Sequence, residues 1–353
     1  MEPARDRPGA AGPAPAFAPV ARVLRSGQPE SWHFGAAAVA TPEGRLVARL
    51  GDPQTATFLR SAAKPFQALP LLAAGGAEAY ALEAADLALI CASHAGRAEH
   101  VERAAALLAR GGLGPEHLGC GPHPPLDAAA ARALCARGES PSALHSNCSG
   151  KHAGMLLACR LLDFPTDGYV EPDHPLQRQI LAWVARASGV AAGSIGLAVD
   201  GCSAPTFRLP LAGAARAYAG LADPELAGWG EGAALARRVV GAMTAAPAMV
   251  AGPGRFTTRL MEVTGGRVLG KEGAEGLYGV AVRGPVALGL AVKIADGGER
   301  CRDGVVLELL RQVGSLSAAE LGELQAFHRP QRRNCRDLVI GEVVAEVELV
   351  EVE

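Results

Sequence analysis

The sequence predicts an α+β fold: a mostly antiparallel sheet built from both chain ends, flanked by helices. Strand-like segments occupy the two ends, whereas alanine- and leucine-rich helical segments form a central region at about residues 95–250. Strands at both ends pair most simply within one shared sheet, on which the helices pack. With 353 residues and 49% hydrophobic side chains, the chain can fill a large core. We expect a flexible Pro/Ala-rich tail over residues 1–18 and a single domain over residues 19–353.

Hydrophobic periodicity and turn residues predict the individual elements. Residues 33–40 and 46–50 are expected to form a β-hairpin closed by the turn at residues 41–44. Residues 58–74 have helical spacing. The helices and strands expected further along are helices near 98–110, 127–137, 150–162, 175–188, 210–221, 231–246 and 303–325, and strands at 267–269, 277–282, 286–294 and 339–352.

Charge and composition exclude several classes of partner. The formal net charge of -2 and the pI near 6.5 leave no basic field for nucleic acid. No apolar run reaches the ~20 residues of a membrane span, and the N-terminal segment lacks the apolar core of a secretory signal. Eight irregularly spaced cysteines are typical of reduced thiols. We expect a cytoplasmic protein with a small-molecule substrate and neither a membrane nor a nucleic-acid partner.

Lysine is rare in this sequence, and its positions are informative. Of 34 basic residues, 30 are arginine and four are lysine: Lys64, Lys151, Lys271 and Lys293. Arginine stays charged, whereas a buried lysine can lose its proton, so an arginine-preferring chain retains lysine where a titratable amine is needed. All four lysines are therefore candidates for chemistry. Lys293, late in a predicted strand and close to Asp296, is the one most typical of a structural role.

Ser61 and Lys64 form an S-x-x-K pattern at the start of a predicted helix. Residues three apart share a helix face, so a neutral Lys64 amine can take the Ser61 hydroxyl proton and make the serine a nucleophile. Pro65 favours a position in the first turn, where the helix dipole stabilises developing negative charge. The alternative is an exposed helix that carries a serine by chance.

Two further segments place reactive side chains beside small residues. Ser93 and His94 follow an apolar run, a placement found in active sites and, more often, in structural turns. Residues 145–154 place Lys151 and His152 where a loop leads into an apolar helix. Free N–H groups at a helix start favour an anion, but the G-x-x-x-x-G-K-[ST] spacing is missing. We therefore exclude nucleotide binding.

Cys148, Lys151 and Cys202 are candidate Zn(II) ligands, provided that the amine is neutral. Asp200 precedes Cys202 at the end of a predicted strand. Spacing alone gives this site low specificity, because no C-x-x-C pair is present and buried cysteines are usually inert. Further along, Arg255 is suited to bind a substrate carboxylate through two hydrogen bonds. Lys271 lies in a glycine-rich turn, where it can act as a cation or a base.

Several motifs together carry a resemblance that no single one carries. They are RSAAKP at 60–65, CASH at 91–94, SNCSGKHAGM at 146–155, TDGY at 166–169, PDHP at 172–175, DGC at 200–202, MVAGPGR at 249–255 and GKEGAEG at 270–276. In this order they resemble the rhizobial-type (class 3) L-asparaginases over about residues 20–335. The resemblance implies hydrolysis of L-asparagine to L-aspartate and ammonia by a homodimer. It also implies a fold similar to serine β-lactamases and glutaminases.

The resemblance assigns the catalytic roles to two serine/lysine pairs. It places the reactive serine and its lysine at Ser61 and Lys64, and a second pair at Ser93 and Lys271. On this assignment Lys64 deprotonates Ser61, which attacks the side-chain amide, while the second pair relays protons. The sequence does not order the two serines in space, so their roles remain exchangeable.

The resemblance also implies a metal site and a substrate site. A zinc-type site falls on Cys148, Lys151 and Cys202, where Zn(II) would orient the substrate or regulate the site. The substrate-binding residues on this assignment are Arg60, His152, Asp200 and Arg255. Asp200 would hold the α-ammonium group and one of the arginines the α-carboxylate. The alternatives are another serine amidohydrolase, such as a glutaminase or a β-lactam-reactive enzyme, and a non-catalytic amino-acid-binding relative.

Overall fold

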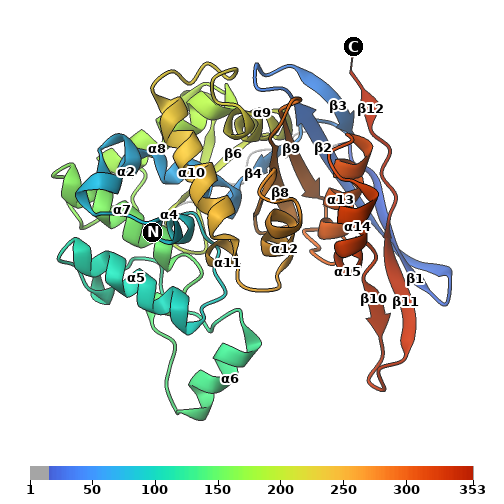
Figure 1. The fold of residues 1–353 in the computed structure, drawn as a ribbon, viewed down its shortest axis with the longest axis horizontal. Coiled ribbons are helices and arrows are strands. Elements are labelled where there is room, and N and C mark those ends of the chain that lie inside the picture. The colour runs from blue at the N-terminus through green and yellow to red at the C-terminus, as the bar shows by residue number, and fades with distance from the viewer. Residues whose placement is uncertain (1–15, 353) are drawn as a thin grey trace, which may run out of the picture.

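A large antiparallel sheet and a helical body lie side by side in the protein (Figure 1). The computed structural model describes residues 16–352, so most of the predicted tail lies outside the described residues. The sheet has the strand order β10-β11-β1-β2-β9-β8-β7, with β3 paired to β2 and β12 to β3. Its strands are β1 (Ala18–Arg25), β2 (Gln28–Ala40), β3 (Leu46–Leu50), β7 (Val268–Glu272), β8 (Leu277–Val282), β9 (Leu288–Ile294), β10 (Gln331–Arg333), β11 (Val339–Ala345) and β12 (Val350–Glu351).

The predicted α+β fold is confirmed, since strands from both chain ends share this one sheet. All its described pairings are antiparallel. A second, small antiparallel sheet has the order β4-β6-β5. Its strands are β4 (Ala56–Phe58), β5 (Gly196–Val199) and β6 (Pro205–Pro210).

Helices fill the middle of the chain, as the sequence predicts. They are α1 (Lys64–Gln67), α2 (Leu69–Ala73), α3 (Gly76–Ala79), α4 (Ala84–Ile90), α5 (Ala98–Arg110), α6 (Ala128–Ala136), α7 (Ser149–Leu161), α8 (Pro175–Ser188), α9 (Leu211–Ala222), α10 (Gly232–Ala245), α11 (Pro247–Val250), α12 (Phe256–Val263), α13 (Arg302–Gln312), α14 (Ala318–Glu323) and α15 (Gln325–His328). Between residues 16 and 352, none of them is both long and apolar enough to cross a membrane.

The helix predicted over residues 58–74 is instead divided into short pieces. A 3₁₀ turn (Arg60–Ala63) leads into α1, and α2 follows after one residue. Pro65 and Pro70 lie in the first turns of α1 and α2. Proline has no backbone donor and restricts the residue before it, so each proline starts a new helix instead of extending the last one.

The large sheet is covered on both faces, and the two faces differ in side-chain size. Side chains alternate along a strand, so Ala36 and Ala38 of β2 contact the core of the helical body. Ala37 and Val39 contact a second core that includes α13. On the first face, α9 packs against β2, β8 and β9. The small side chains of that face let the helix approach closely.

Two glycines make the contact between α9 and the sheet especially close. A Cβ atom at Gly289 of β9 would lie 2.0 and 2.1 Å from backbone atoms of α9. A Cβ atom at Gly279 of β8 would lie 2.1 Å from the ring of Tyr218 in α9. The Tyr218 hydroxyl donates a hydrogen bond to the Ala62 carbonyl oxygen at 2.7 Å. The close packing of α9 on the sheet therefore positions the 3₁₀ turn that carries Ser61.

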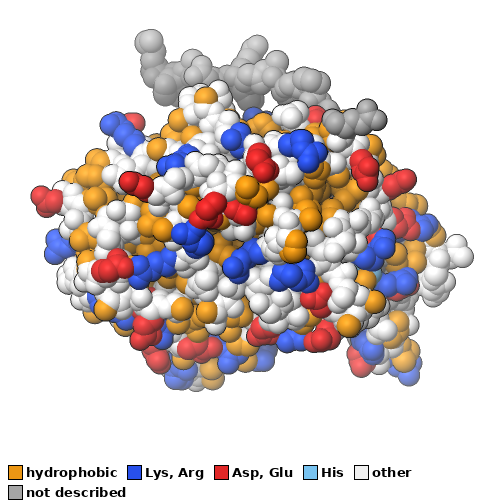
Figure 2. All heavy atoms as spheres, turned by 45° about the horizontal axis from the view of Figure 1, so that its top comes forward, with side chains coloured by type: hydrophobic (Ala, Val, Ile, Leu, Met, Phe, Trp, Pro, Cys, Tyr) orange, Lys and Arg blue, Asp and Glu red, His pale blue; other side chains and the backbone are white. Residues whose placement is uncertain are grey.

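Figure 2 shows acidic and basic side chains interspersed over one face of the molecule, with apolar side chains between them. This mixing agrees with the formal net charge of -2. The face shown has no field of one sign that would attract a polyanion.

We predict that Gly289→Ala destabilises the protein by about 3 kcal/mol, because the added methyl group overlaps helix backbone that cannot move aside as a side chain can. Gly241→Ala is the matched control, since a Cβ atom at this exposed α10 position meets nothing within 4 Å. There the change should stabilise by about 0.5 kcal/mol through helix propensity. Urea denaturation measures both, and equal effects at the two sites would contradict the packing argument.

Candidate active site

Ser93 lies where three parts of the fold meet. It follows α4 and is buried, and its backbone N–H donates to the Val250 carbonyl oxygen at 2.9 Å. Lys64, the first residue of α1, and Lys271, in β7, are both buried. The Lys64 Nζ lies 3.1 Å from the Ser93 Oγ, and the Lys271 Nζ lies 2.8 Å from the same oxygen. One hydroxyl is thus held between two buried amines.

The two lysines differ in their other contacts. The Lys64 Nζ also donates to the carbonyl oxygens of Ala92 and Asn147, so three acceptors use its three N–H donors. Within residues 16–352, the Lys271 Nζ has, besides Ser93, only the Glu272 carbonyl oxygen as a partner, at 2.9 Å. A neutral amine has two donors and one lone pair, which suits the surroundings of Lys271 better than those of Lys64.

The electrostatics of Lys271 favour the neutral amine. Burial lowers the pKa of Lys271 to about 7, with Lys64 adding to the effect and the Glu272 carboxylate opposing it. Desolvation and a nearby like charge both disfavour the protonated form of a lysine. Lys271 is therefore the amine at this site that can gain and lose a proton near neutral pH.

Ser61 lies in the 3₁₀ turn before α1, and Arg60 ahead of it has a left-handed backbone with φ +48°. Among the described residues no hydrogen bond joins Ser61 to Lys64, although the S-x-x-K spacing predicts one. The Lys64 amine instead turns toward the carbonyl oxygens after α4 and before α7, which are fixed acceptors. The second predicted pair, Ser93 and Lys271, is in direct contact.

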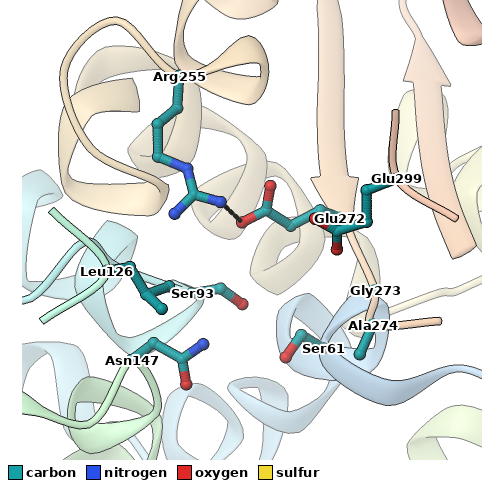
Figure 3. Close-up of a pocket in the computed structure, with 9 residues that line it drawn as sticks. All are labelled: Ser61, Ser93, Leu126, Asn147, Arg255, Glu272, Gly273, Ala274 and Glu299. Carbon is teal, nitrogen blue, oxygen red and sulfur yellow. Dashed lines mark hydrogen bonds and ion pairs between the residues drawn. The ribbon is translucent and has the colours of Figure 1, made fainter. Parts of the chain in front are cut away.

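Both serines open onto one cavity of about 540 Å³. Its lining consists of Ser61, Ser93, Leu126, Asn147, Arg255, Glu272, Gly273, Ala274 and Glu299. In Figure 3 the two serine side chains and the Asn147 amide point into the same hollow, with Arg255 and Glu272 on its far side. Sequence reasoning missed Asn147, Glu272 and Glu299. The available signals were the position of Asn147 inside a recognised motif and of Glu272 beside Lys271.

The residues expected to bind substrate lie in two separate places. Arg60 pairs with Asp200, with the Arg60 Nε 2.6 Å from the Asp200 Oδ1, and neither belongs to the cavity lining given above. Arg255 does line the cavity, where its Nη2 lies 3.3 Å from the Glu272 Oε1.

His152 is buried in α7, and its Nδ1 lies 2.6 Å from the Tyr169 hydroxyl. Tyr169 Oη also accepts the Gly119 N–H. The His152 Nε2 is buried without a hydrogen-bond partner among the described residues. Lys293 donates to the carbonyl oxygens of Glu275 and Ile294 and not to the expected Asp296, so its contacts are structural ones to backbone.

The candidate zinc ligands gather in one buried cluster. Cys148, Lys151 and Cys202 are all buried, and the Lys151 Nζ lies 2.8 Å from the Cys202 Sγ. A hydrogen bond from Cys202 holds the pKa of Cys148 well below its usual range, with Lys64 and Lys151 adding to the effect against burial. Burial lowers the pKa of Lys151, but the two cysteines and Asp200 outweigh it and the pKa is raised. Between residues 16 and 352 no group of three or more His, Cys, Asp or Glu side chains suits a metal.

The chain belongs to the L-asparaginase II family, which it matches over residues 21–345. Membership of this family makes it an amidohydrolase. No curated protein matches the sequence. Among solved structures, the native form of Mglu is similar at 20% identity and a TM-score of 0.34, covering 81% of this chain and 67% of that one. Mglu in its glutamate form has 20% identity and a TM-score of 0.33, covering 80% and 61%.

We predict that Lys271 titrates near pH 7, far below an ordinary lysine. Because the chain has four lysines, ¹³C-lysine labelling gives an NMR spectrum simple enough to follow each side chain against pH. One signal should move near pH 7 and be missing from Lys271→Met. Four lysines that all titrate above about pH 9 would contradict the assignment.

Proposed function

We propose that this amidohydrolase converts L-asparagine to L-aspartate and ammonia through a covalent acyl-enzyme intermediate. The contact of Ser93 with two buried lysines at the wall of an open cavity supports this proposal most directly. A serine hydroxyl is a weak nucleophile until a neighbouring base removes its proton. Here the base and the hydroxyl are already within hydrogen-bond distance.

In the proposed mechanism Lys271 is the general base and Lys64 a fixed positive charge. The neutral Lys271 amine takes the Ser93 proton while the Ser93 Oγ attacks the side-chain amide carbon. The Lys271 ammonium then gives its proton to the leaving nitrogen, and ammonia departs. Water adds to the resulting ester with Lys271 again as base, which frees aspartate and restores Ser93. The Lys64 ammonium stabilises negative charge on Ser93 as it develops.

Ser61 is the second hydroxyl of the site and the nucleophile that the S-x-x-K pattern favours. The contacts support Ser93 instead, since the described structure gives Ser61 no lysine partner. Ser61 and the Asn147 amide face the same hollow, where they can hydrogen-bond the substrate amide (Figure 3). We propose that these two groups position the amide for attack.

We also propose that Cys148, Lys151 and Cys202 bind Zn(II). The two thiol sulfurs and the amine nitrogen would hold the ion, since zinc binds sulfur and nitrogen ligands. When bound, zinc would supply a fixed positive charge that orients groups next to Asn147. It would displace the proton that Lys151 carries in the metal-free cluster.

The expected cytoplasmic homodimer is retained as part of the proposal. All eight cysteines are free, which suits a reducing compartment. Several large apolar side chains, including Trp32 and Phe34 of β2 and Val339 of β11, are exposed on the large sheet and offer contact surface to a second copy.

We predict that the purified protein releases ammonia from L-asparagine faster than from L-glutamine, and that Ser93→Ala lowers kcat by at least about 10³-fold through loss of the nucleophile. Ser61→Ala should retain more turnover than Ser93→Ala. A coupled ammonia assay measures turnover of the two amides by the wild type and both variants. A chromogenic β-lactam, followed by its change in absorbance, is the further substrate. If the protein preferred glutamine or the lactam, that compound would replace asparagine as the proposed substrate.

The identity of the nucleophile can be read separately from the rates. A diazoketone analogue of asparagine alkylates the attacking oxygen, and peptide mass mapping locates the adduct. We expect it on Ser93. An adduct on Ser61 would restore the assignment that the S-x-x-K spacing favours and make Ser93 the relay.

We predict about one zinc per chain in protein purified without chelator, and a loss of most of this zinc in Cys148→Ser. The exposed Cys135 supplies a control, because Cys135→Ser removes a thiol outside the cluster. Elemental analysis gives the stoichiometry independently of activity. Equal zinc contents in the two variants, or none in the wild type, would remove zinc from the proposal.

A further inference from the structure

The wall of the cavity opposite Ser61 and Asn147 carries a buried acid and a half-exposed base. The Glu272 side chain is 11% exposed, while the Arg255 side chain is 35% exposed. The two meet through one contact of 3.3 Å between the Arg255 Nη2 and the Glu272 Oε1. This is long for a charge-assisted hydrogen bond. Each group therefore has capacity to bind a ligand charge.

The other charges on this wall are already engaged. Glu299 lines the cavity and pairs with Arg302 at 3.1 Å. Arg302 is almost fully buried and also lies 2.9 Å from Asp303. Arg302 is thus held between two carboxylates, which leaves Arg255 as the cation of the cavity lining that can meet a ligand carboxylate.

We infer that Arg255 and Glu272 form the subsite that recognises the free amino-acid end of the substrate, with Glu272 binding the α-ammonium group and Arg255 the α-carboxylate. The inference rests on the proposed function, because it orients an amino-acid amide with its amide at the serines. A zwitterion meets both charges at once, and its pairing with the acid and the base replaces their single long contact. A ligand must then carry a free amine to bind Glu272 and a free carboxylate to bind Arg255.

The competing candidate for the ammonium group is Asp200. Its carboxylate is paired with Arg60 at 2.6 Å and also accepts the Gly201 N–H at 2.7 Å. It lies outside the lining of the cavity that contains Ser93. Glu272 lines that cavity and directly follows Lys271 in the sequence, so a bound ammonium lies on the same strand end as the base.

We predict that Glu272→Gln lowers kcat/KM for L-asparagine at least about ten-fold, the usual scale for a lost hydrogen bond to a charged group. The rate with succinamate, which has the same carboxylate and amide but no amine, should stay within about two-fold of wild type. Glu342→Gln makes the same change at an exposed Arg329–Glu342 pair and should alter neither rate. Asp200→Asn tests the competitor with the same two substrates.

The ratio between the two substrates separates recognition from general damage. An equal loss on asparagine and succinamate in Glu272→Gln would make Glu272 a support for Lys271 and overturn the inference. The selective loss appearing in Asp200→Asn instead would also overturn it.

Binding tests the subsite apart from hydrolysis. Calorimetric titration with L-aspartate and with succinate should show that wild type prefers aspartate, and that Glu272→Gln loses this preference. If the wild type bound aspartate in this way but released no ammonia from any amide, the subsite would stand and the proposed function would fail. Absence of any aspartate preference in the wild type would overturn the subsite.

Discussion

Two buried amines share one hydroxyl oxygen in this protein, and this contact constrains everything around it. Two ammonium ions so close in a medium of low dielectric repel each other, and this repulsion favours the neutral form of one amine. The different surroundings of the two lysines determine which amine loses its proton more easily. Fixed carbonyl oxygens stabilise the charge on Lys64, whereas burial strips Lys271 of the solvent that would stabilise its charge.

The three groups reach this geometry from distant parts of the fold. Lys64 comes from a proline-started helix, Ser93 from the end of α4 and Lys271 from a strand of the large sheet. α9 connects the large sheet to the turn before α1, because it packs on β8 and β9 while the Tyr218 hydroxyl donates a hydrogen bond to the Ala62 carbonyl oxygen of that turn. The glycines under α9 thus contribute to the precision of a site that they do not touch.

Local pattern was sufficient to predict the fold class, whereas the assignment of Ser93 and Lys271 as a pair depended on the family resemblance. Alternating strands at both ends and helical periodicity between them are local features of the sequence. The scarcity of lysine makes all four lysines candidates for chemistry, including Lys293, whose contacts are structural. The strand β1 escaped prediction because it begins within the Pro/Ala-rich N-terminal segment, where turn residues mask the alternation.

The arrangement of the site was harder to predict, because it depends on contacts between distant segments. The S-x-x-K spacing places Ser61 near Lys64, but backbone acceptors from elsewhere orient the amine toward Ser93. Likewise, the sequence around Glu272 does not show that this carboxylate lines the cavity. Glu272 becomes a cavity-lining acid only because β7 ends at the cavity beside Arg255.

The pairing of β1 with β11 has a consequence for how the chain acquires its structure. Residues such as Arg22 and Glu346, in contact across this pairing, are 324 positions apart in the sequence. A ribosome must therefore release nearly the whole polypeptide before β1 finds its second neighbour. Contacts of such high sequence separation slow folding and leave strand edges exposed meanwhile. During synthesis the outer edge of β1 therefore stays unpaired until the C-terminal strands emerge, and such an unpaired edge is a site for aggregation.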